Sequence, residues 1–152
     1  MKSTTFHQAY TRLFALIMLC FTAFGFTNYV GLDSYEIYLN NKLVLKQSVN
    51  QPLNLRVLQL GSAAPTDLLR ITYKHCHTPN TGTDRSIVVQ DENGNTLKKW
   101  TFANAHDTDV SMTIPVKELL RLEKDHAARD LSLHYASREL PKGETLAFLK
   151  VK

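Results

Sequence analysis

The sequence predicts an all-β fold: an antiparallel β-sandwich, or an open barrel, of about eight short strands with one helix. Three observations lead to this prediction. Apolar and polar residues alternate along most of the chain after residue 33, which is typical of half-buried strands. Turn residues recur at short intervals between these segments. Only the segment 116–127 has apolar residues at helical spacing, so the alternation of strands and helices found in α/β folds is missing.

Two hairpins are predicted from their turn residues. In the first, apolar residues alternate on both sides of Asn40-Asn41. Asparagine tolerates the positive φ of a tight turn, so these residues predict a two-residue hairpin connection. In the second hairpin, the segments 87–90 and 96–103 flank the turn sequence Asp-Glu-Asn-Gly-Asn.

The other strands are predicted from alternation alone. Proline-rich or small-residue loops at 61–66, 78–84 and 140–143 separate them. The residues that define the strands are Leu53, Leu55 and Val57; Leu69, Ile71, Tyr73, His75 and His77; Val110, Met112 and Ile114; Leu131, Leu133 and Tyr135; and Leu146 and Phe148.

The predicted helix begins after Pro115, a residue well suited to a helix start. Val116, Leu119 and Leu120 then follow at the spacing of one helix face. Neither an internal repeat nor a linker divides the chain, so we expect a single domain over residues 33–152.

Residues 1–25 have the features of a signal peptide. Lys2 and Arg12 make the beginning positive, and residues 13–26 carry no charge. This apolar run is shorter than the ~20 residues that span a bilayer. We therefore expect cleavage and export to the periplasm, the cell envelope or the medium, without a membrane span in the mature chain. A retained signal anchor and a lipidated Cys20 are the alternatives.

Charge and cysteine content exclude some classes of protein. The net charge of the 152 residues is +4. Without Lys2 and Arg12, 16 of the 18 basic residues remain against 14 acidic ones, an excess too small to indicate nucleic-acid binding. If Cys20 leaves with the signal, Cys76 is the one cysteine of the mature chain, and an intramolecular disulfide is excluded. Cys76 is then either a small core residue or the site of a disulfide-linked dimer.

Four segments give the chain a resemblance to a known group of proteins. They are SYEIYLNNKLVLKQ, DENGNTLKKWTFA, MTIPVKELLRLEK and ELPKGETLAFLKV. The chain resembles small, uncharacterised exported proteins of Bacteroidetes-type bacteria over nearly all of its mature length. The resemblance implies an exported all-β protein, and it brings no catalytic or binding residue with it.

His75 and His77 form the one cluster that suggests a specific chemistry. Residues i and i+2 of a strand point to the same face, about 6.5–7 Å apart at their Cα atoms. Two imidazoles so placed can bind a transition metal such as zinc or copper. The side chains that would complete such a site are His106, Asp107, Asp109, His126 and His134. The alternative is that both histidines are hydrogen-bonded or solvated residues at the polar end of their strand.

The sequence favours a non-enzymatic function. It contains no G-x-S-x-G, H-E-x-x-H, P-loop or Rossmann motif. We expect a binding domain without a cofactor that recognises an envelope partner or a small ligand through an edge strand or the 78–85 loop. A metal-binding envelope protein that uses His75 and His77 is the alternative. Strand aromatics such as Trp100, Phe102 and Tyr38 suggest a sugar-stacking platform, although core positions are more common for such residues.

Overall fold

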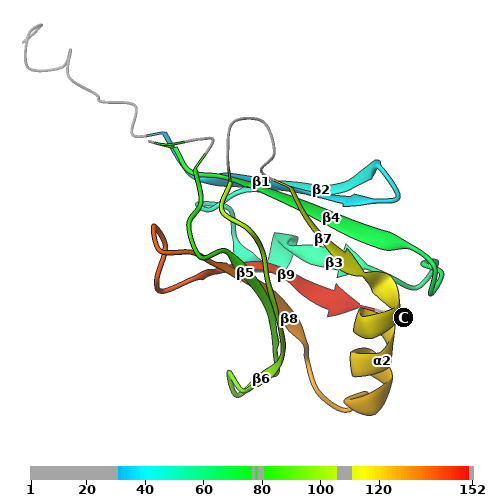
Figure 1. Ribbon diagram of the computed structural model, residues 1–152. Helices are drawn as coiled ribbons and strands as arrows, with labels where there is room; N and C mark the ends of the chain where they lie inside the picture. The colour runs from blue at the N-terminus through cyan, green and yellow to red at the C-terminus, as the bar shows by residue number, and fades with distance from the viewer. Residues whose placement is uncertain (1–30, 77, 79–80, 106–110, 151–152) are drawn as a thin grey trace, which may run out of the picture. The chain divides into compact units, whose positions relative to one another are not determined.

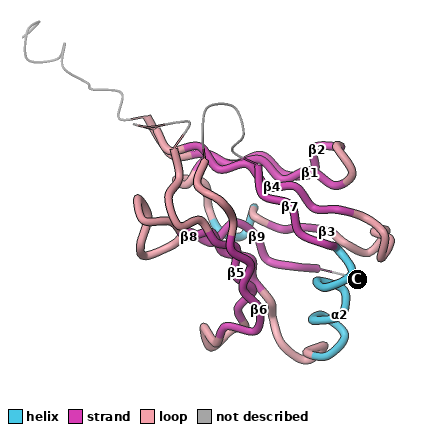
Figure 2. The backbone as a smooth tube through the Cα atoms, in the orientation of Figure 1, coloured by secondary structure: helices cyan, strands magenta, loops and turns pink. Residues whose placement is uncertain are grey.

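The computed structural model describes residues 31–76, 78, 81–105 and 111–150, so the predicted signal peptide lies outside the described residues (Figure 1). The described part is mostly β, as predicted, with nine strands in two sheets and one α-helix (Figures 1 and 2). The elements are β1 (Ser34–Leu39), β2 (Lys42–Ser48), the 3₁₀ turn η1 (Leu53–Leu55), β3 (Val57–Gln59), β4 (Leu68–Lys74), β5 (Ser86–Gln90), β6 (Thr96–Thr101), β7 (Ser111–Pro115), α2 (Val116–Asp125), β8 (Ser132–Ala136) and β9 (Glu144–Lys150).

The first sheet has the strand order β2-β1-β4-β7 and is antiparallel throughout. Its β1–β2 hairpin turns at the predicted dipeptide, with φ of 46° at Asn40 and 67° at Asn41. Two positive φ values are what a type I′ turn requires, and this turn matches the twist of the strands it joins. The prediction of this hairpin is therefore confirmed.

The second sheet has the order β3-β9-β8-β5-β6. The β5–β6 hairpin is confirmed, and Gly94 takes the positive φ of 79° in its turn. The expectation of a wholly antiparallel arrangement is wrong at one place, because β3 pairs with β9 in parallel. Parallel strands are joined by a long connection and not by a tight turn. The turn residues that predict hairpins therefore do not reveal a parallel pair.

The strand predicted from Leu53, Leu55 and Val57 is wrong in its phase. Leu53 and Leu55 lie in η1 with exposed fractions of 49% and 54%, and the strand is only the short β3. Leu58 and Leu60 are buried instead. Leucines occupy both alternating phases of this segment, so alternation could not decide which set is buried.

A β-bulge in the β8–β9 pair changes which residues of β9 face inward. The register passes from Leu133 opposite Ala147 to His134 opposite Thr145, which leaves Leu146 as the extra residue. Leu146 and Ala147 are both buried, whereas Phe148 is only half-buried. The expected shared face of Leu146 and Phe148 is therefore wrong, since a bulge shifts the alternation by one residue.

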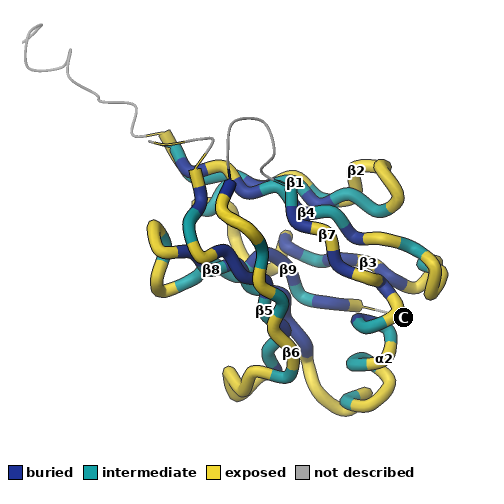
Figure 3. The backbone as a smooth tube through the Cα atoms, in the orientation of Figure 1, coloured by how far each residue is buried: buried dark blue, intermediate teal, exposed yellow. Residues whose placement is uncertain are grey.

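One hydrophobic cluster contains residues of both sheets, as the buried segments in Figure 3 indicate. Tyr73 of β4 and Tyr135 of β8 stack in this cluster with ring centroids 4.2 Å apart. The hydroxyl of Tyr35 donates a 2.6 Å hydrogen bond to the carbonyl of Leu146 in the other sheet. Helix α2 starts after Pro115, as predicted, and ends at Asp125, two residues before the predicted end. It buries Val116 and Leu119.

A buried arginine joins the end of β2 to β9. Arg56 is 2% exposed. Its Nη2 donates to the carbonyls of Val49 (2.6 Å) and Gln51 (2.9 Å), and its Nη1 donates to the carbonyl of Thr145 (2.6 Å) and to the carboxylate of Glu144. Because a buried charge is costly unless it is paired, these contacts make Arg56 a structural clamp.

Candidate functional site

His75 extends the inward-facing row of β4 by one position and is 6% exposed. Its Nδ1 lies 3.1 Å from Oδ2 of Asp33, and its Nε2 lies 3.3 Å from the hydroxyl of Tyr135 and 3.4 Å from Oγ of Ser137. Both ring nitrogens therefore have partners within the domain. The expected placement of His75 on the apolar face of its strand is confirmed.

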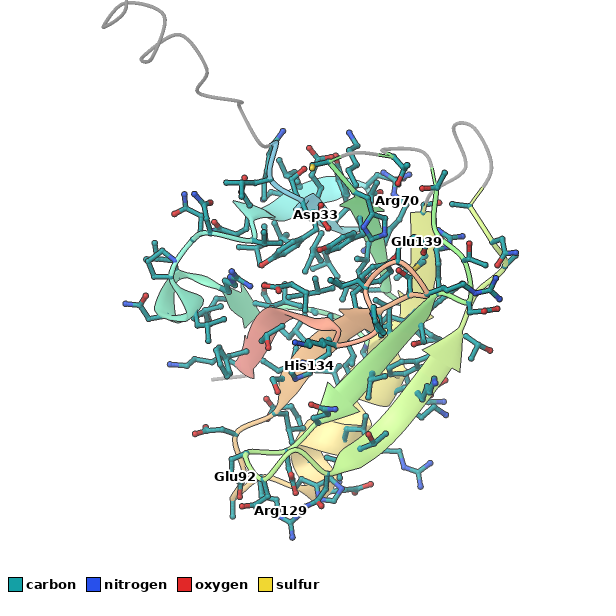
Figure 4. All side chains as sticks on the ribbon, turned by 90° about the vertical axis from the view of Figure 1, so that its left-hand side faces the viewer. Asp33, Arg70, Glu92, Arg129, His134 and Glu139 are labelled. Atoms are coloured by element: carbon teal, nitrogen blue, oxygen red, sulfur yellow. The ribbon has the colours of Figure 1, made fainter. Side chains whose placement is uncertain are left out.

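Asp33 connects three groups at this end of β4. Its Oδ2 accepts a 3.0 Å hydrogen bond from the hydroxyl of Tyr73, besides the contact with His75. Its Oδ1 accepts the backbone N–H of Cys76 at 2.8 Å. Figure 4 shows Asp33 at the same end of the domain as Glu139, with His134 further along. Asp33 is not recognisable in the sequence, because a single acid before a strand gives no signal of a contact some forty residues away.

The environment keeps the tyrosines of this cluster neutral. Burial raises the pKa of Tyr73 far above its ordinary value of 10.0, and the neighbouring charge of Asp33 raises it further. Burial likewise raises the pKa of Tyr135. Neutral hydroxyls around a buried imidazole form a satisfied hydrogen-bond network, which stabilises the packing of β4 against β8.

The metal hypothesis for His75 and His77 stays a prediction. His77 lies outside the described residues, as do three of the proposed additional ligands, His106, Asp107 and Asp109. Within the described ranges, no group of three or more histidine, cysteine, aspartate or glutamate side chains is arranged to hold a metal ion. His75 would have to give up a present partner to bind one.

Cys76 is half-buried, directly after the buried His75. The backbone of Gly31 passes close to it, since a Cβ built on Gly31 would lie 3.3 Å from the Cβ of Cys76. Cys76 is thus neither a fully buried core residue nor a fully exposed thiol. A disulfide-linked dimer through Cys76 stays a prediction.

The described part of the 78–85 loop is attached to the β8–β9 connection. The Glu139 carboxylate accepts hydrogen bonds from the backbone N–H (2.9 Å) and the hydroxyl (2.6 Å) of Thr83. Arg138 forms a 2.7 Å ion pair with Asp84. Burial alone would raise the pKa of Glu139, but the hydrogen bonds from Thr83 outweigh it and lower this pKa to about 2. These contacts fix residues 81–85 as a defined surface.

The outer edge of β2 has exposed apolar side chains. We call Lys42–Ser48, the outermost strand of the first sheet, the β2 edge. Near its start Leu43 is 46% exposed and Val44 is 37% exposed, and Val44 is the extra residue of a β-bulge in the β1–β2 pair. The outer strand β6 differs, because lysines occupy its centre and Lys98 forms a 2.9 Å ion pair with Glu118 of α2. Lysines and a bulge are usual protections of an edge strand, and β2 has Lys42, Lys46 and the bulge at Val44 beside its exposed apolar residues.

The aromatic residues divide between core and surface. Tyr35, Tyr73 and Tyr135 are buried in the shared cluster, which is the more common role considered for them. Tyr38 points away from that cluster, with its hydroxyl donating to Glu36 at 2.7 Å and the Arg70 guanidinium 4.8 Å from its ring centroid. These tyrosines therefore do not form one exposed platform.

No family model, curated protein or solved structure matches this chain. In the part of the chain that the structure describes, none of the helices has the length and hydrophobicity needed for a membrane crossing.

Proposed function

We propose that this chain is an exported, non-enzymatic β-sandwich domain that binds an extended segment of an envelope protein along the β2 edge. The signal-like pattern of residues 1–25 supports export. The cluster of buried residues shared by both sheets supports the sandwich arrangement.

The exposed Leu43-Val44 pair near the start of an edge strand carries this proposal. An added strand gains main-chain hydrogen bonds from the open edge, and its alternate side chains contact the exposed apolar residues. An exposed apolar edge can also pair with unintended strands. Retention of such an edge therefore favours a binding function for it.

The charges of β2 indicate the chemistry of the partner. Lys42 and Lys46 flank the apolar pair, and Lys46 forms a 2.8 Å ion pair with Glu36. A second copy that paired antiparallel about Val44 would place Lys42 of one chain opposite Lys46 of the other, and like charges directly opposite each other are destabilising. A strand with apolar residues flanked by acidic ones fits better than a second copy does.

The proposal is tested by site-specific photo-crosslinking in the host cell. A benzophenone side chain is placed at position 42 on β2, and a matched one at position 99 on the charged β6. We expect one discrete crosslinked product at position 42 that disappears when Leu43→Glu and Val44→Glu are introduced together. Equal products at both positions, or a product at position 42 that survives the double substitution, would overturn the proposal. The mass of the recovered chain shows whether it begins near residue 26.

A further inference from the structure

The outer face of the second sheet has a cleft of about 350 Å³. The β5–β6 turn, the start of β8 and the middle of β9 surround it, and all of its lining residues belong to the described part of the chain. The side chains that characterise its chemistry are Gln90, Glu92, Ser132, His134, Thr145 and Phe148. Figure 4 labels His134 on β8 and Glu92 at the β5–β6 turn.

The β8–β9 bulge builds this cleft. Ser132 lies opposite Phe148, and after the bulge His134 lies opposite Thr145. Without the extra Leu146, Thr145 would belong to the inward-facing set, since Ala147 faces the core. The bulge instead directs Thr145 to the outer face beside His134. Bulges commonly reorient a side chain next to a binding or active site.

His134 lies between two hydroxyl groups. Its Nε2 is 2.8 Å from Oγ of Ser132, and its Nδ1 is 3.3 Å from Oγ1 of Thr145. Burial lowers the pKa of His134, although the charge of Glu144 acts in the opposite direction. A neutral imidazole has one donor and one acceptor nitrogen, so it fixes the orientation of both hydroxyls. The Ser132 hydroxyl also donates to the carbonyl of Gln90 at 3.4 Å, so Ser132 keeps capacity as an acceptor, and the Thr145 hydroxyl keeps capacity for a further group in the cleft.

We propose that this cleft binds a neutral polyhydroxylated ligand of the size of one pyranose ring. The volume lies within the range of small-molecule sites, which combine an apolar wall with a few oriented polar groups. The half-buried ring of Phe148 offers an apolar surface to the C–H face of a sugar. The oriented hydroxyls of Ser132 and Thr145 and the carboxylate of Glu92 supply hydrogen bonds to sugar hydroxyls.

The charges around the cleft disfavour an anionic ligand. Glu92 and Asp130 are both exposed and acidic. The buried Asp91 is already paired with Arg129 at 2.8 Å, so this arginine is engaged with a carboxylate of the protein. A phosphate or carboxylate ligand would meet these acids, whereas neutral hydroxyls can donate to them.

The proposal is tested by NMR titration of the isotope-labelled full chain with D-glucose, D-galactose and N-acetylglucosamine, each alone and at millimolar concentration. We expect at least one of the three to give saturable shift changes centred on Ser132, His134, Thr145 and Phe148. Inorganic phosphate is the anionic probe and should leave these signals unchanged. Absence of a saturable change with all three sugars, or saturation by phosphate, would overturn the proposal.

Matched variants separate the cleft from general effects on the fold. Phe148→Ala removes the apolar wall and should weaken sugar binding about tenfold. Thr145→Val keeps the shape but removes one hydroxyl and should weaken binding about fivefold. The controls on the other sheet, Tyr38→Ala and Thr72→Val, should bind as the unchanged chain does. The spectrum of each variant reports folding directly, and a folded Phe148→Ala that binds with unchanged affinity would contradict the proposal. The cleft and the β2 edge lie on different sheets, so either proposal can fail alone.

Discussion

Oδ2 of Asp33 lies 3.1 Å from Nδ1 of His75, so a residue just before β1 holds the residue just after β4. The same carboxylate also accepts hydrogen bonds from the Tyr73 hydroxyl and the Cys76 backbone. One carboxylate thus contacts three groups: Nδ1 of His75, the hydroxyl of Tyr73 and the backbone N–H of Cys76. A polar network of this kind stabilises a fold only when every member has its partner.

We expect Asp33→Ala to lower the free energy of unfolding by about 2–3 kcal/mol, because it leaves the partly buried groups around His75 unsatisfied. Urea denaturation monitored by tryptophan fluorescence measures this change. Asp125→Ala is the control, since it removes only an exposed i,i+4 pair with Arg121 and should cost under about 0.5 kcal/mol. Equal effects of both substitutions would show that the network contributes little.

Arg56→Met should destabilise the domain by about 3–5 kcal/mol, because it breaks a buried ion pair and leaves several carbonyls without their donor. The matched control is Arg121→Met, because the Arg121 side chain is 82% exposed; this change should alter stability by no more than about 0.5 kcal/mol. Thermal and urea denaturation of both variants measure the difference. A stable Arg56→Met would mean that apolar packing replaces the clamp.

Glu139 should make stability depend on acid pH. Burial raises its pKa, yet the hydrogen bonds from Thr83 prevail and hold it at about 2, below the ordinary value of 4.5. A lowered folded-state pKa gives a stabilising contribution that is complete above pH 4.5 and is lost as the pH falls toward about 2. Glu139→Gln should remove this part of the acid dependence, while Glu92→Gln on the β5–β6 turn should keep it. Urea midpoints measured from pH 5 to about pH 2 decide between these outcomes.

The histidine-pair hypothesis predicts that zinc or copper raises the melting temperature of the full chain and that His77→Ala abolishes this increase. His77→Ala is a sharper test than His75→Ala, because His75 is already part of the buried network. Stabilisation by a metal follows from binding to the folded state alone. If neither zinc nor copper changes the melting temperature, the hypothesis is excluded.

The sequence allowed the correct prediction of elements whose signals are local. Asn40-Asn41 defines a tight turn by backbone preference, and Pro115 followed by the Val116 and Leu119 spacing defines the helix. The inward face of β4, with Leu69, Ile71, Tyr73 and His75 buried, follows from a single unambiguous alternation.

The sequence-based predictions are wrong where pairing between strands far apart in the chain determines which residues are buried. The bulge at Leu146 depends on the register of β9 against β8, which the residues of β9 alone do not specify. The leucines around Arg56 occupy both phases, and the parallel β3–β9 pair determines which set is buried. Asp33 gains its role from partners some forty residues away, and Thr145 gains its role from the bulge that places it beside His134, so the candidate sites around them were not predictable from local pattern.

The position of β9 in the sheet has a consequence for synthesis of the chain. Among the described strands β9 comes last in chain order, yet it is an interior strand, between β3 and β8, and it also supplies acceptors of Arg56. A polypeptide released before residue 144 would therefore have two open strand edges and a buried-type arginine without its acidic partner. Such a fragment cannot form the β3–β9 and β8–β9 pairs, so we expect chains that end before β9 to stay accessible to proteases, whereas chains that contain β9 can close the second sheet.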